Sequence, residues 1–376
     1  MLNPLSKALV LFAIMSIDCC QLAQGAPLTL DEALLASAST HPSVTTKKNE
    51  SAAASSSLET SKWQRFPALS AQSQAGQAGG KSVTSIRIDQ PLWTGGRITA
   101  DIDANTAKVE AAEDGVLEAE QKVLTRTASL FTELVRLQSR LDAADENIAE
   151  HQRLLELIER RSAQQVSSPS EVVAAKARLQ QAQSERIQLQ VSATNTKADL
   201  EQVVGHPIAE IKVPKIELTT SSDLPATVDA ALQYSPQLKR MSAETDVSEA
   251  EIKTRKATML PMLSARHERF WGDNYPGSIT YLALTFQPGG GLSALSSMHE
   301  AESRRDAAMS SREATRKDIV DSIRADWNQV QSAQADTAVL HELVASTREV
   351  YESFVRQYSA GRKTWLDVLN ARREAI

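Results

Sequence analysis

The chain has 376 residues, a formal net charge of −6, and only 4% aromatic residues. Globular domains with a thick core use more aromatic side chains, so this composition favours long helices packed along narrow seams. The negative net charge gives no electrostatic reason to expect nucleic acid as a partner.

Residues 1–25 have the organisation of a secretory signal peptide. Lys7 precedes an apolar run, and a more polar stretch leads to the expected cleavage site before Ala26. Lipidation at Cys19 or Cys20 is the alternative, but the residues that precede them fit a lipoprotein signal poorly. The exported chain would then have no cysteine for disulfide or thiolate chemistry. Beyond the signal, no stretch is apolar enough for a membrane helix.

Residues 26–207 are predicted to form a first structural repeat that begins with helix and passes into strands. The helical part extends to about residue 61 and is interrupted at His41-Pro42. Strands are predicted near 68–76 and 82–92, because the second segment alternates apolar and polar residues between glycine-rich breaks. The residues of its more apolar face are Thr84, Ile86 and Ile88.

A long helical hairpin follows these strands. Residues 97–163 carry apolar positions spaced by four and three, which is the pattern of a coiled-coil seam. The seam consists of Leu130, Leu134, Leu137, Leu141, Ala144, Ile148, His151, Leu155 and Ile158. A second helix is predicted from Pro169 to about Val204, which leaves a tip near 164–171. We interpret His151 as a polar residue in the seam, because the histidines lack metal-like spacing.

The second half of the chain repeats the first. A linker at 208–225 precedes a second repeat at 226–376, with strands near 263–271 and 278–287 and a tip near 359–367. In the first copy about 36 helical residues follow the tip, whereas the second copy has thirteen. We therefore expect a truncated last helix; an unusually short second unit is the alternative.

The two tips share a capping-box signature, in which a hydroxyl residue is followed three positions later by an acid. Ser168 precedes Glu171 in the first tip, and Thr364 precedes Asp367 in the second. From spacing alone, helix capping is the simpler interpretation of both acids. Packing along the seam would explain Tyr358. The simplest interpretation of Lys363 is a solvated lysine in a turn.

No catalytic or cofactor-binding pattern is present. The sequence has no H-E-x-x-H, and Gly289-Gly290-Gly291 lacks the Lys-Ser/Thr of a nucleotide-binding loop. No Ser-His-Asp arrangement or nucleophile elbow occurs in a suitable context. We therefore expect no enzymatic activity and no cofactor or metal.

The duplicated arrangement resembles the TolC family of outer-membrane channel proteins over nearly all of the mature chain. The matching stretches are T-L-D-E-A-L at 29–34 with His41-Pro42, I-D-Q-P-L-W-T-G-G-R at 88–97, the tip at 162–175, and Y-S-A-G-R-K-T-W-L-D-V-L-N-A at 358–371. The Q-P-L-W-T-G-G-R form is most similar to members that serve type I secretion. The resemblance implies a mainly α fold with a small β part, built from two tandem repeats.

The same resemblance implies a homotrimer located in the outer membrane. Each subunit would contribute four strands to one shared 12-stranded β-barrel and its helical hairpins to an α-barrel tunnel in the periplasm. Physical chemistry agrees, because open sheet edges are not tolerated in lipid and twelve is an even strand number in the known range. A helix spanning 97–163 would be about 100 Å long, far more than a bilayer is thick.

The resemblance further implies a periplasmic gate at the tips. It places Asp367 on the first acid of a ring at the constriction, and Asn370 where a second acid is usual. Glu171 falls on the acid of the partner tip. Tyr358 and Lys363 fall on the tyrosine and the basic residue that hold the entrance closed. One carboxylate ring instead of two should weaken a preference for cations without abolishing it.

We expect a passive outer-membrane conduit of an efflux or type I secretion system. Its partners would be a periplasmic adaptor (membrane fusion) protein, an inner-membrane transporter and outer-membrane lipid. The alternative is a periplasmic coiled-coil adaptor or structural stalk without a pore. Adaptors commonly have one hairpin flanked by lipoyl-like β-modules, which this sequence lacks. Trp93, Trp271 and Tyr275 are candidates for an interfacial aromatic belt, although an ordinary turn explains Trp93 equally well.

Overall fold

The computed structural model describes residues 27–74, 83–214, 223–271, 277–287, 290–291 and 293–374. The expected signal peptide and Tyr275 lie outside these ranges. The chain divides into two compact units, and each contains parts of both sequence repeats. The hairpin unit comprises Met1–His41, Lys122–Thr220 and Asp326–Ile376, and the sheet unit comprises Pro42–Gln121 and Ser221–Ala325.

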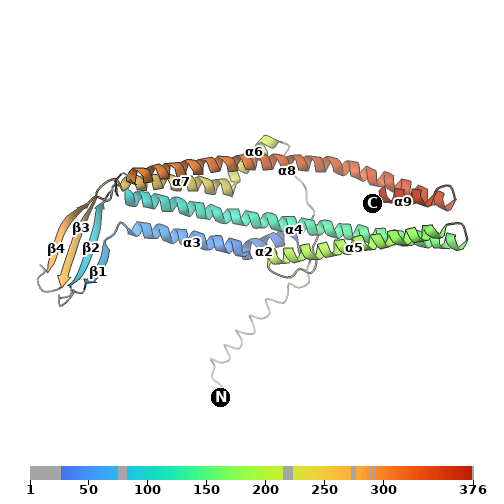
Figure 1. Ribbon diagram of the computed structural model, residues 1–376, viewed down its shortest axis with the longest axis horizontal. Helices are drawn as coiled ribbons and strands as arrows, with labels where there is room; N and C mark the ends of the chain where they lie inside the picture. The colour runs from blue at the N-terminus through green and yellow to red at the C-terminus, as the bar shows by residue number, and fades with distance from the viewer. Residues whose placement is uncertain are drawn as a thin grey trace, which may run out of the picture. The chain divides into compact units, whose positions relative to one another are not determined.

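The sheet unit contains one four-stranded antiparallel sheet in the order β1-β2-β3-β4. Figure 1 shows the strands side by side; they are β1 (Ala68–Gln74), β2 (Val83–Trp93), β3 (Met262–Trp271) and β4 (Ser278–Thr285). The central pair, β2 and β3, joins one strand from each sequence repeat. Helices α3 (Pro42–Trp63), α6 (Leu224–Tyr234) and α7 (Pro236–Ala257) complete this unit. The break expected at His41-Pro42 is confirmed, since α3 begins at Pro42.

The two faces of the sheet differ in chemistry because successive side chains point to opposite sides. On one face, Arg87 pairs with Glu268, and Arg266 pairs with Asp89 at 2.5 Å. On the opposite face, apolar side chains are exposed, namely Leu69, Ile86, Ile88, Leu282 and Leu284. A register shift between Pro91 and Trp93 places Trp93 opposite Leu263, on this apolar face.

A glycine turn connects β2 to the next helix. Gly95 and Gly96 both have positive φ, of 62° and 87°, which side chains with a Cβ rarely adopt. At Gly95 a Cβ would also lie 2.8 Å from the Cβ of Leu260, whereas nothing lies within 4 Å of one at Gly96. The close approach at Gly95 explains the need for glycine there more strongly than the turn alone.

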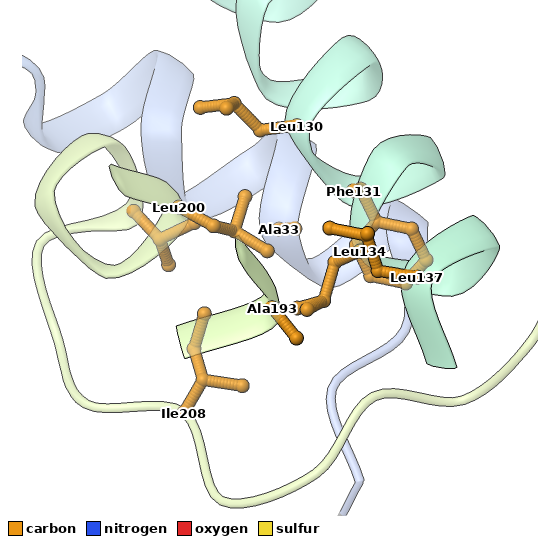
Figure 2. Packing of buried hydrophobic residues seen from close by; sticks show 9 residues of the cluster. Ala33, Leu130, Phe131, Leu134, Leu137, Ala193, Leu200 and Ile208 are labelled. Atoms are coloured by element: carbon orange, nitrogen blue, oxygen red, sulfur yellow. The ribbon is translucent and has the colours of Figure 1, made fainter. Parts of the chain in front are cut away.

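The hairpin unit is built from three of the described helices and parts of two others. Helices α2 (Leu30–Thr40), α5 (Pro169–Val204) and α9 (Trp365–Glu374) lie within it, and α4 (Arg97–Ala163) and α8 (Ser293–Ser359) enter it. Seam residues of α4 pack with α2, α5 and Ile208 in a core that Figure 2 shows from close by. A parallel β-bridge between Leu28 and Ile211 holds the start of the expected linker beside α2. None of the described helices combines the length and apolarity needed to cross a membrane.

The apolar positions of α8 that correspond through the repeat to the seam of α4 are only partly buried. Tyr351 and Tyr358 are buried near its C-terminal end, but Leu340 and Val344 are 54% and 56% exposed. The described part of α9 has ten residues, and along α8 it reaches only the last turns, where it joins a cluster with α4 and α5. The periodicity therefore predicted an apolar face correctly, without specifying which element covers it.

Candidate functional site at the hairpin tips

The two tips have the same backbone design. Gln165 and Gly361, separated by 196 residues, both have positive φ, of 60° and 73°. In each tip an amide one residue later donates to a carbonyl five residues back: Val166 to Arg161 and Arg362 to Gln357, both at 2.9 Å. This is the Schellman bond that ends a helix. The internal repeat thus extends to the hydrogen bonds of the turns, although the first copy uses glutamine where glycine is preferred.

Only one of the two expected capping boxes forms among the described residues. The Asp367 carboxylate accepts from the Thr364 amide at 3.0 Å, and the Asp367 amide donates to the Thr364 hydroxyl at 3.3 Å. At the other tip the Ser168 hydroxyl accepts from the Ser170 amide, not from Glu171. The prediction of a reciprocal box for Glu171 was therefore wrong. Pro169 at the first helical position accompanies this tighter cap.

The caps also affect the charge of the acid at the second tip. Hydrogen bonds from the Thr364 backbone amide, and then from its hydroxyl, lower the pKa of Asp367. These donors favour the ionised form, so Asp367 carries its negative charge throughout the neutral range. Asn370 lies one turn later on the same face of α9 and carries no charge.

Tyr358 connects the two tips. Its side chain is 4% exposed, and its hydroxyl lies 3.0 Å from the hydroxyl of Ser167 in the first tip. The Arg161 guanidinium lies 4.7 Å from the centre of the Tyr358 ring, and Trp365 packs against the ring at 5.9 Å. Arg161 also donates to the Ser359 carbonyl at 3.1 Å. Tyr358 therefore takes part in a hydrogen bond, a cation–π contact and an aromatic contact at the same place.

Lys363 contacts an aromatic ring of its own tip. Its ammonium lies 4.3 Å from the centre of the Phe354 ring, within the same tip. In the described part of the chain, the polar contacts across the tips come instead from Arg161 and Ser167. Sequence reasoning missed both residues, because an arginine in a last helical turn and a serine in a loop are common features.

A second polar layer lies behind the tips. The Tyr351 hydroxyl donates to the Glu150 carboxylate at 2.7 Å, and Arg372 stacks over the Tyr351 ring at 5.3 Å. Arg372 also donates to Asn147 at 3.1 Å. Burial and then the Glu150 carboxylate raise the pKa of Tyr351 well above its usual range. Nothing in the sequence around Tyr351 indicates these partners.

A cavity of about 250 Å³ lies among α4, α5 and α9 of the hairpin unit. His151, Arg178, Glu185, Asn370 and Arg372 are among the residues that line it. Burial, followed by the charges of Arg372 and Arg178, lowers the pKa of His151 and favours the neutral imidazole. Within the described ranges, no cluster of three or more metal-ligating side chains occurs.

The five residues predicted for the site thus fall into four settings. Tyr358 is buried at the contact between the tips, and Lys363 packs within its own tip. Asp367 and Asn370 lie on one face of α9. Glu171 lies in the first turn of α5, in the first tip, and is partly exposed. The tips are held together by an apolar cluster from α4, α5, α8 and α9, which includes Ile158, Tyr358, Trp365 and Val368.

Comparisons with known proteins agree with this architecture. The sequence profile of the outer membrane efflux protein family matches residues 29–206 and 227–375. The chain is 20% identical over 310 residues to the alkaline protease secretion protein AprF of Pseudomonas aeruginosa, covering 77% of this chain and 63% of AprF. It is 21% identical over 290 residues to the outer membrane protein TolC of Vibrio cholerae, covering 72% of this chain and 66% of TolC.

A solved structure of the outer membrane protein VceC from Vibrio cholerae has the same fold. The TM-score is 0.80 at 18% identity, and the match covers 92% of this chain and 89% of VceC. At this identity the likeness shows the fold alone. The chain spans slightly less than two thirds of the length of AprF and of TolC.

Proposed function

We propose, because the chain belongs to the outer membrane efflux protein family, that it is the outer-membrane channel subunit of a tripartite efflux or type I secretion system. In this role it is a passive conduit, and an inner-membrane transporter supplies the energy. A periplasmic adaptor docks at the helical hairpins. The similarity to AprF, an alkaline protease secretion protein, supports the secretion branch of this proposal.

The observation that carries the proposal is the four-stranded sheet. Its exposed apolar face includes Leu282 and Leu284, which are 66% and 69% exposed. Within the described ranges, its two outer strands, β1 and β4, each pair with one neighbouring strand. Lipid satisfies an apolar face but cannot satisfy an open edge, so the edges must pair with other copies. Three copies give a closed barrel of twelve strands, and the charged face then lines its lumen.

The tips form the periplasmic gate in this proposal. The contact of Tyr358 with Ser167 and Arg161 holds the second tip against the first and keeps the entrance closed. Opening moves the α8–α9 tip away and breaks these contacts. Lys363 restrains the turn by its cation–π contact with Phe354.

The acidic groups of the gate act on ions. Three copies of Asp367 form one ring of carboxylates at the constriction. The family pattern has a second acid at the position that Asn370 occupies in this chain. Glu171 adds negative charge at the partner tip. A ring of carboxylates attracts cations and repels anions, so the entrance prefers cations.

A non-pore periplasmic adaptor or stalk is the second candidate. It would explain the two hairpins, but it gives no role to a sheet with an exposed apolar face and unpaired edges. Membrane fractionation of cells that express the chain separates the two functions. The channel proposal predicts an oligomer in the outer-membrane fraction that dissociates on heating. A monomer recovered from the soluble periplasmic fraction would support the adaptor instead.

A further inference from the structure

The apolar face of the sheet changes character along its strands. Near the helices it is apolar, with Leu263 paired to Leu284 and Leu69 paired to Ile88. Near the hairpin turns it becomes basic and aromatic. Between the two parts, His267 lies 2.7 Å from the hydroxyl of Thr280. The residues of the second part are Thr84, Ile86, Arg269, Trp271 and Ser278.

Arg269 carries a positive charge on this face of the sheet. Arg87 and Arg266, on the opposite face of the sheet, each have a carboxylate partner. Arg269 forms no ion pair with any residue that the structure describes; its guanidinium instead lies 5.2 Å from the centre of the Trp271 ring. It is exposed between Ile86 on β2 and Ser278 on β4. Arg269 therefore presents a positive charge with no ion pair among the described residues, next to apolar and hydroxyl groups, and this arrangement suits an anion from outside the chain.

The position of Arg269 along the strands matches the surface of a membrane. Trp93 and Thr84 are nine residues apart on β2, and Thr84 pairs with Trp271. Nine residues span about 30 Å along a strand, or roughly 23 Å across a membrane at the usual barrel tilt. The apolar band of such barrels is about 25 Å tall, with aromatic residues at both borders. Trp93 and Trp271 therefore mark the two borders, and Arg269 lies beside the second.

The second border faces the cell exterior in the proposed orientation. β2 leads into α4 and β3 follows α7, so the helices leave the sheet at the Trp93 end. The helices are periplasmic in the proposed function, which places Trp271 and Arg269 at the outer leaflet.

We propose that Arg269, supported by Trp271, binds a phosphate group of an anionic lipid in the outer leaflet. This inference rests on the outer-membrane location proposed above. A guanidinium binds phosphate oxygens through two parallel hydrogen bonds, and an indole ring suits the headgroup level. The hydroxyl of Ser278, paired with Arg269 across the strands, is a further donor. The acyl chains of the lipid cover Ile86 and Leu282, whereas a free phosphate ion would gain nothing from these contacts.

The test measures lipid binding by the purified full chain. The protein in detergent micelles is titrated with phosphorylated lipid A or with the same lipid after its phosphates are removed, and bound lipid is counted by native mass spectrometry. Arg269→Gln should weaken binding of the phosphorylated lipid roughly tenfold, as expected for a lost charge-assisted hydrogen bond. Arg269→Lys should retain part of the affinity.

The matched control is Arg65→Gln, which removes an exposed arginine just before β1, near the opposite border. It should bind the phosphorylated lipid like the wild type. Equal affinity of wild type and Arg269→Gln, or equal affinity for the two lipids, would overturn the inference. Competition by inorganic phosphate at the same concentration as the lipid would also overturn the inference. If one of these results occurs but Arg269→Gln still forms conducting channels, the inference about lipid binding fails and the proposed channel function stands.

Discussion

Removing the Tyr358 hydroxyl should favour the open gate. Tyr358→Phe keeps the ring, and with it the contacts to Arg161 and Trp365, but deletes the 3.0 Å hydrogen bond to Ser167. A neutral hydrogen bond of this kind stabilises by about 1 kcal/mol. Three bonds in a trimer sum to about 3 kcal/mol, which shifts the closed-to-open ratio roughly a hundredfold if all three break on opening.

Single-channel recording in planar bilayers measures this shift as open probability. Ser167→Ala should have a similar effect, and the double variant should add little to either, because both delete the same bond. Tyr234→Phe is the matched control, since Tyr234 is 69% exposed in α6 of the sheet unit. An unchanged open probability in Tyr358→Phe, or additive effects in the double variant, would refute the proposed role of this contact.

Three other predictions concern charge, stability and the glycine turn. Asp367→Asn should abolish the cation preference, measured as the reversal potential in a salt gradient. Because the pKa of Asp367 is lowered, the wild type should keep its preference as pH falls to about 4 and lose it only below the usual aspartate pKa; loss near pH 6 would contradict this. Tyr351→Phe should destabilise the hairpin unit by about 1–2 kcal/mol in urea unfolding, since one oxygen of Glu150 loses its donor while the other still accepts from Arg153. The raised pKa of Tyr351 adds stability that is present below pH ~10 and lost as pH rises further, so a wild-type stability that stays constant above pH 10 would argue against this bond. Gly95→Ala should destabilise the fold by about 1–3 kcal/mol, and Gly96→Ala by less, because only Gly95 lies against a neighbouring leucine; equal effects would rule out the close approach.

The helices and strands could be predicted from sequence because their signals are local. The heptad spacing and the proline and glycine at its ends predicted α4 and α5 as the structure has them, Arg97–Ala163 and Pro169–Val204. Alternation in one strand, transferred through the repeat, located all four strands. The mainly α fold with a small sheet and the family are both confirmed.

The partners across the tips could not be predicted in this way. Tyr358 and Ser167 are 191 residues apart, and Tyr351 and Glu150 are 201 apart. Such pairs form only after two hairpins pack, and nothing in the spacing of either residue specifies the other. The capping box predicted at Ser168 was wrong because a serine at this position can accept from either of two backbone amides, and its hydroxyl accepts from that of Ser170.

The most direct test of the proposed function is conductance of the purified full chain in planar lipid bilayers. We predict discrete current steps with a preference for cations, from an oligomer whose strands close into one barrel. Folded protein that inserts into the bilayer without passing current would contradict the conduit. Protein that stays in the aqueous phase would contradict its membrane location as well.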